Sequence, residues 1–128
     1  MIRALATEDY QVIAPWYEKR KANPPPLVCL QEGYGWELEG KLVAAIFVYT
    51  CNRKEIAFTA WHVTNPELTA YKAHSALVGL ERGIEYVLSK LGYRVVVCMA
   101  KKSLSKVLLR EGWQTNHSEM QQMYKELK

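Results

Sequence analysis

One strand, one loop and one helix near the middle of the chain bring together the residues best suited to acid–base chemistry and to anion binding. His62 lies in an apolar run over residues 58–63, and imidazole is the side chain whose ordinary pKa is closest to neutral pH. The loop after this run leads into a long amphipathic helix. The first amides of a helix lack partners within it, and the helix dipole places partial positive charge there. We therefore expect an anion site, suited to a phosphate group, where the loop meets the helix.

The long helix is predicted by apolar residues that recur every three or four positions from Ala76 onward. Glycine readily adopts the positive φ common at helix C-termini, so Gly92 is expected to end this helix. Charged residues, among them Glu81, Arg82 and Glu85, fall on the opposite face. The apolar positions are Leu77, Leu80, Ile84, Val87, Leu88 and Leu91.

Local patterns predict the remaining elements on either side of this helix. Before it we expect a strand over 1–6, a helix starting at Thr7, a stiff proline loop over 23–26, and strands over 34–38, 42–50 and 55–63. The first two of these last strands form a hairpin with its turn at residues 39–41. After the helix we expect a strand over 94–99 buried on both faces, a helix capped by Ser103, and a final pair of strands over 113–114 and 120–127.

The resulting order is β-α-β-β-β-α-β-α-β-β. It predicts a single α+β domain over residues 1–128, with a mixed, mostly antiparallel sheet of six to seven strands and helices on both faces.

Composition excludes several classes of protein. Apolar residues make up 49% and charged residues 23% of the chain, as in ordinary globular proteins. No apolar run approaches the roughly 18 residues of a membrane helix, and no signal peptide is recognised. The three cysteines, Cys29, Cys51 and Cys98, suggest neither disulfides nor a metal site, which indicates a cytoplasmic setting. The net charge of +4 is too small to indicate nucleic acid.

Three segments, taken together, resemble the GNAT superfamily of acyl-CoA-dependent N-acyltransferases. Residues 2–10 (IRALATEDY) have the Arg-x-x-x-x-x-Asp spacing of its opening strand and helix. Residues 103–113 (SLSKVLLREGW) match its late helix, and residues 120–128 (MQQMYKELK) match its closing strand. The resemblance covers nearly the whole chain. It implies a GNAT-like fold, acetyl-CoA or another acyl-CoA as co-substrate, and an amine on a small molecule or protein as acceptor.

The resemblance also places the pyrophosphate loop, which in the family reads Arg/Gln-x-x-Gly-x-Gly/Ala. Counted back from Gly92 it falls on residues 72–77, where Ser75 and Leu77 replace the two small residues. Side chains would then have to replace the close backbone approach that glycine permits. The alternative is that Lys72 is solvated and residues 74–75 only begin the helix. The implied cofactor-binding residues are Val63, Thr64, Lys72, Ala73, His74, Ser75, Ala76 and Ser103.

Acyl transfer from a thioester to an amine needs a base with a pKa near neutral. His62 is the first candidate, and strict alternation along the strand puts it on the face of Phe58 and Ala60. Glu37 and Tyr49 could lie across the same cleft as further catalytic residues. The alternatives are a hydrogen-bonded core histidine and ordinary strand-surface residues.

The family's general acid is a tyrosine on the late helix, and here Leu108 occupies that position. Either Tyr71, Ser105 or water protonates the leaving thiolate, or the protein no longer catalyses acyl transfer. Aromatic residues are numerous in the first helix and the sheet, where they form core or line a planar substrate pocket. They are Trp16, Tyr17, Tyr34, Trp36, Tyr49 and Trp61.

Three functions follow from these observations. The first is an N-acyltransferase for a small-molecule or protein amine. The second is a nucleic-acid-directed enzyme of the same fold, which would bind DNA or RNA in a salt-dependent manner. The third is a non-catalytic binding protein that has kept the fold. A homodimer is compatible with the sequence, but nothing in it specifies one.

Overall fold

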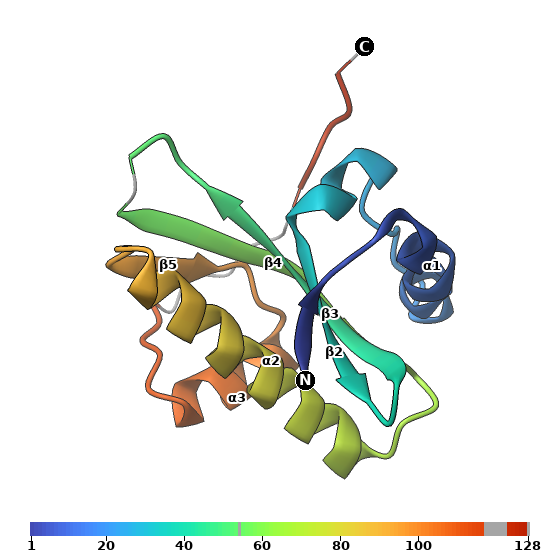
Figure 1. The fold of residues 1–128 in the computed structure, drawn as a ribbon. Helices are drawn as coiled ribbons and strands as arrows, with labels where there is room; N and C mark the ends of the chain where they lie inside the picture. Colours follow the sequence, from blue (N-terminus) through green and yellow to red (C-terminus); the bar gives the residue numbers. More distant parts are fainter. Residues whose placement is uncertain (54, 117–122, 128) are drawn as a thin grey trace.

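The computed structural model describes residues 1–53, 55–116 and 123–127, which form one five-stranded mixed sheet with helices on both faces (Figure 1). The strands lie in the order β1-β2-β3-β4-β5; all neighbours are antiparallel except the parallel pair β4 and β5. They are β1 (Ile2–Ala4), β2 (Gly33–Leu38), β3 (Lys41–Thr50), β4 (Ile56–Thr64) and β5 (Val95–Cys98). The helices are α1 (Tyr10–Lys19), α2 (Ala70–Lys90) and α3 (Lys102–Arg110), with short 3-10 helices at Thr7–Asp9 and Leu27–Glu32. The predicted α+β class and element order are confirmed up to α3.

The predicted sheet of six to seven strands is too large for the described part of the chain. Residues 113–116 and 123–127 form no strand, and the rest of the predicted closing strand, residues 120–122, lies outside the described residues. Within the described sheet β5 is therefore an edge strand, and its residues Val95 and Val97 are 53% and 42% exposed. The prediction that this strand is buried on both faces was wrong, because β-branched residues favour a strand whether one or two of its faces are covered.

The hairpin of β2 and β3 has the predicted turn. Glu39 and Gly40 both have positive φ, at 54° and 76°. This is the conformation of a two-residue type I′ turn, whose twist matches that of the two strands.

Two separate cores hold the helices against the sheet, and α1 and α2 lie on its opposite sides (Figure 1). Under α1, Ile13 packs with Phe47 of β3. Under α2, Leu80 and Ile84 pack with Ile46 of β3. Within the described residues, no helix is long and apolar enough to cross a membrane.

The two later helices begin at different residues from those predicted. α2 starts at Ala70, ahead of the predicted apolar stripe, and Thr69 caps it by accepting a hydrogen bond from the Lys72 amide at 3.2 Å. α3 starts at Lys102, so Ser103 lies in its first turn and is not the predicted cap. α2 ends as predicted, with Gly92 at a φ of 95°.

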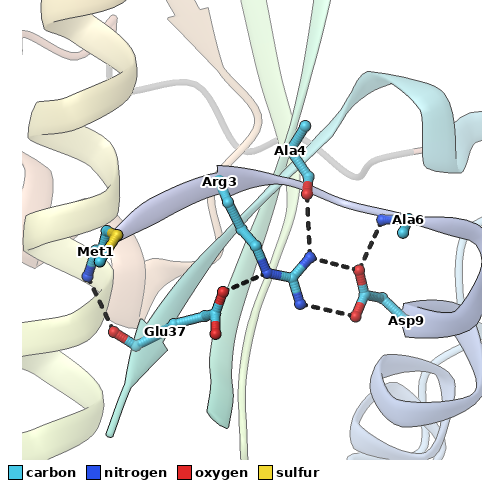
Figure 2. A network of polar contacts seen from close by, with 6 residues as sticks. All are labelled: Met1, Arg3, Ala4, Ala6, Asp9 and Glu37. Carbon is cyan, nitrogen blue, oxygen red and sulfur yellow. Dashed lines mark hydrogen bonds and ion pairs between the residues drawn. The ribbon is translucent and has the colours of Figure 1, made fainter. Parts of the chain in front are cut away.

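One guanidinium ties the first strand to its neighbours (Figure 2). The Arg3 Nη1 and Nη2 atoms donate to the two carboxylate oxygens of Asp9 at 2.7 and 2.9 Å, and Nε donates to Glu37 at 2.6 Å. Asp9 also accepts from the Ala6 amide at 2.7 Å. The spacing of Arg3 and Asp9 noted in the sequence thus closes an ion pair between β1 and the start of the first helix. Hydrogen bonds from Arg3 and the Ala6 amide hold the pKa of Asp9 below its usual value.

Asp9→Ala should lower the free energy of unfolding at pH 7 by about 1.5–3 kcal/mol, because it removes the charged bonds to Arg3 and the bond from the Ala6 amide. Urea denaturation measures the change. Arg82→Ala, which breaks the exposed pair with Glu111, is the matched control and should have no measurable effect. Because the pKa of Asp9 is lowered in the folded state, the difference from wild type should persist at pH 5–7 and shrink as pH falls below about 4. Equal effects of the two variants would contradict this account.

Candidate functional site

β4 loses one of its two neighbouring strands halfway along its length. Its first residues, from Ile56 to Thr59, pair with β5, and β5 then ends while β4 continues to Thr64. On the other side the register with β3 shifts, since Ala45 lies opposite Val63 but Phe47 lies opposite Ala60. Two residues of β4, Trp61 and His62, therefore face one residue of β3, which is a β-bulge. Trp61 adopts a φ of 59°, which is unusual for a residue other than glycine.

The bulge turns His62 to the side of the sheet covered by α2. Its imidazole contacts Glu81 of α2, and Ala57 of the same strand belongs to the core under α2. Strict alternation would have placed these two β4 residues on opposite faces. The predicted grouping of His62 with Phe58 and Ala60 was therefore wrong, because the bulge inserts one residue into the alternation.

His62 and Glu81 form a buried pair at this point. The His62 Nε2 atom lies 3.1 Å from Glu81 Oε2 and 3.7 Å from the Cys98 Sγ atom at the end of β5. The two paired side chains are only 5% and 3% exposed, so the prediction that Glu81 lies on the outer face of the helix was wrong. Burial lowers the pKa of His62, but the hydrogen bonds to Cys98 and Glu81 outweigh this effect and raise the pKa to about 9. The imidazole therefore carries a proton at neutral pH.

Three polar atoms in this region are buried without a hydrogen-bond partner in the described part of the protein. They are Thr59 Oγ1, His62 Nδ1 and Glu81 Oε1. A buried polar atom without a partner costs about 1–3 kcal/mol, so such atoms call for an explanation, for example a bound polar group or an ordered water.

A cavity of about 530 Å³ opens between the end of β4, the first turns of α2, and α3. It is in the range of small-molecule binding sites. His62 and five of the predicted cofactor-binding residues line it: Val63, Thr64, Ala73, His74 and Ser103. Leu77, which occupies a position of the family's small residues, is also on the wall and leaves the cavity open.

The other predicted site residues lie elsewhere. Lys72 and Ser75 are on the exposed side of α2, and Ala76 is buried in the core beneath it. Glu37 belongs to the ion-pair network of Figure 2. Tyr49 packs in the core under α1, where burial and a hydrogen bond with Cys29 raise its pKa.

The expected pyrophosphate loop is helical here. Residues 72–77 lie inside α2, and the Ala73 amide donates to the Thr69 carbonyl at 2.9 Å. The prediction of a loop there was wrong because Ser75 and Leu77, which stand where the family pattern has its small residues, disfavour a helix less than glycine does. The amides of Lys72 and Ala73 are thus already hydrogen-bonded.

The wall on the α1 side of the cavity is aromatic. The ring of Trp61 makes edge contacts with Tyr17, at a centroid distance of 6.3 Å, and with Tyr124, at 5.1 Å. The Tyr17 hydroxyl donates to the Trp61 carbonyl. Arg20 of the segment after α1 donates to the Thr64 carbonyl at 2.7 Å. The sequence suggested Tyr17 and Trp61 as pocket residues, but it gave no signal for Arg20 or Tyr124, because their positions depend on contacts between distant parts of the chain.

No protein-family model matches the chain, and no curated protein sequence matches it. Solved structures do. A Mycobacterium tuberculosis protein in complex with CoA and NLQ is 17% identical, with 88% of this chain and 70% of that chain covered and a TM-score of 0.70. An aminoglycoside acetyltransferase from an uncultured soil sample, in complex with sisomicin, is 16% identical over 100% and 96% of the two chains, with a TM-score of 0.66.

N-acetylglutamate synthase from Neisseria gonorrhoeae, complexed with coenzyme A and N-acetyl-glutamate, is 13% identical, with a TM-score of 0.66 over 86% of this chain and 27% of that one. At these identities the likeness shows the fold. The GNAT-like fold expected from the sequence is therefore confirmed.

Glu81→Gln should lower the pKa of His62 by about one unit or more, because it removes the negative charge that stabilises the imidazolium. An NMR titration of the imidazole measures it, with a wild-type midpoint near 9. Glu85→Gln changes a carboxylate on the same helix for which no bond to His62 is seen, and it should leave the midpoint in place. Equal midpoints in wild type and Glu81→Gln would show that the pair does not hold the proton.

The same pair should make stability depend on pH. The pKa of His62 is raised from 6.5 to about 9 on folding, so its stabilising contribution is complete below pH 6.5 and is lost as pH rises through 9. The free energy of unfolding should fall over this interval in wild type and fall less in Glu81→Gln. Parallel curves for the two proteins would contradict the assignment.

Proposed function

We propose that the protein is an N-acyltransferase that transfers an acyl group, acetyl in the simplest case, from acyl-CoA to an amine. The observation that carries this proposal is the open cavity beside β4, at the point where β4 and β5 part, in a fold shared with proteins crystallised with CoA. The unpaired edge of β4 can bond the amides of such a co-substrate, and the helix ends can bind its phosphates.

Val63 and Thr64 offer the first set of contacts. In the described residues no strand pairs with β4 beyond Thr59 on the β5 side, so backbone groups of this stretch can bond the amides of the pantetheine arm. The side chains of His74 in the first turns of α2 and Ser103 in the first turn of α3 would hold the phosphate end, near the positive ends of both helices, and Ala73 would pack against it. Lys101 lies on the same wall and adds a positive charge.

His62 is suited to a different role from the base predicted from the sequence. An imidazole with a pKa near 9 is already protonated at neutral pH, so it can donate a proton and cannot accept one. Leu108, at the position of the family's general acid, is buried and has no proton to give. We assign to His62 the protonation of the leaving thiolate, with Glu81 holding the ring in place.

The His62 side chain can both give the proton that the sulfur needs and take up the proton that the amine loses. The amine nitrogen bonds to the carbonyl carbon, the carbon–sulfur bond breaks, and the sulfur takes the proton of His62. The imidazole is then neutral and can accept the proton that the acylated nitrogen must lose. Glu81 Oε2 favours the return to the charged form.

Binding of acetyl-CoA tests the proposal before any acceptor is known. A 100-fold excess of ligand over its Kd should raise the free energy of unfolding by about 2.7 kcal/mol. Leu104→Trp places a large ring on the wall of the cavity and should weaken binding at least tenfold in isothermal titration calorimetry. Leu109→Trp puts the same ring on the exposed side of α3, where it should leave binding unchanged.

Two outcomes would overturn the proposal. If the wild-type protein neither binds any acyl-CoA nor is stabilised by one, the proposed acyltransferase activity is wrong. Equal loss of binding in the two tryptophan variants would show that the cavity is not the binding site.

A further inference from the structure

The residues that line the cavity indicate which kind of acceptor it can bind. Trp61 stands between Tyr17 and Tyr124, and both neighbouring rings meet it edge-on, with interplanar angles of 80° and 66°. All three side chains line the same cavity as His62. A further aromatic ring packed here gains from offset or edge contacts in addition to its buried area, whereas an alkyl chain gains only from the buried area.

The charges on the walls point the same way. Among the described residues that line the cavity, none is an aspartate or a glutamate, and Arg20 and Lys101 are cations. The nearby carboxylate Glu81 is buried and bonded to His62. Glu111, directly after α3, is bonded to Arg82, and this bond, with a smaller contribution from His74 on the α2 wall, lowers the pKa of that carboxyl.

These walls are unfavourable both for binding an alkyl amine and for removing its proton. Its pKa resembles that of lysine, about 10.4, so it enters as a cation. It meets cations, and His62, which faces Glu81 from α2 and Cys98 from β5, is already protonated and cannot remove its proton. A weakly basic amine is neutral at pH 7 and needs no base before it attacks.

We propose, on the basis of the function proposed above, that the acceptor is a weakly basic amine attached to an aromatic ring, an arylamine, whose ring packs against Trp61 and Tyr124. The nitrogen attacks the acyl carbonyl as the free amine, the carbon–sulfur bond breaks, and the sulfur takes a proton from His62. The acylated nitrogen then returns a proton to His62. Amines of lysine side chains and polyamines are disfavoured as acceptors by the same walls.

Aniline and benzylamine form a matched pair for the test, because both carry a phenyl ring and only benzylamine has the basicity of an alkyl amine. With acetyl-CoA at pH 7, product detected by mass spectrometry should give a kcat/KM at least tenfold higher for aniline. Between pH 6 and 8 the rate with benzylamine should rise about tenfold per unit, following its neutral fraction, while the rate with aniline stays level.

A pair of tyrosine variants tests the aromatic wall. Tyr124→Ala should raise the KM for aniline at least fivefold and leave the Kd for acetyl-CoA unchanged. Tyr124 is 47% exposed, so its removal should leave the fold intact. Tyr86→Ala, on the outer surface of α2, should change neither constant.

The possible outcomes separate the two proposals. Acetyl-CoA binding with benzylamine preferred at pH 7, or with neither amine acetylated, would overturn the arylamine assignment and leave the acyl-CoA site standing. Equal effects of Tyr124→Ala and Tyr86→Ala would also overturn it. No binding of acetyl-CoA would overturn the proposed function, and the acceptor assignment with it.

Discussion

The bulge at Trp61 and His62 is the constraint on which the rest of this site depends. A positive φ at a tryptophan costs about 1–2 kcal/mol, and the surrounding contacts must offset that cost. The Tyr17 hydroxyl bonds the Trp61 carbonyl, and two rings pack against its indole. The same extra residue turns His62 toward α2. Without the bulge, alternation would place His62 under α1, away from Glu81.

The His62–Glu81 pair links the site to the core. Glu81 follows Leu80, whose side chain packs in the core between α2 and the sheet. The pair therefore forms only when this helix is packed on the sheet. A buried ion pair is weak as a source of stability, because desolvation of the two charges offsets much of their attraction. A strongly raised histidine pKa on the wall of a cavity is more often associated with function. We therefore assign the pair a role in the proposed chemistry and only a small contribution to stability.

The fold was accessible from the sequence because its signals are local. The turn at Glu39 and Gly40 and the helix end at Gly92 each depend on neighbouring residues, and both were predicted correctly. The Arg3–Asp9 spacing, which resembles the family pattern, corresponds to an ion pair in the structure. Six or seven strands were expected because the last segments have strand-like patterns, but the described parts of them do not join the sheet.

The site was accessible only in part, because it depends on contacts between distant segments. No glycine or proline marks the bulge in β4, so alternation gave His62 the wrong face. Glu81 has a charged neighbour in Arg82, and a helical pattern alone could not show that it pairs with a histidine nineteen positions earlier. The wall residues Arg20 and Tyr124 come from opposite ends of the chain. Val63, Thr64, Ala73, His74 and Ser103, which the family resemblance indicates as cofactor-binding residues, line the cavity, and their role there stays a prediction.

The central claim is that a co-substrate lies where β4 leaves β5. The most direct measurement is the change in backbone amide NMR shifts as CoA is added. The account predicts large changes at Trp61, Val63 and Thr64 and in the first turns of α2 and α3, with little change at residues 56–59, where β5 still pairs with β4. Changes confined to the far edge of the sheet, around β1 and β2, would contradict it.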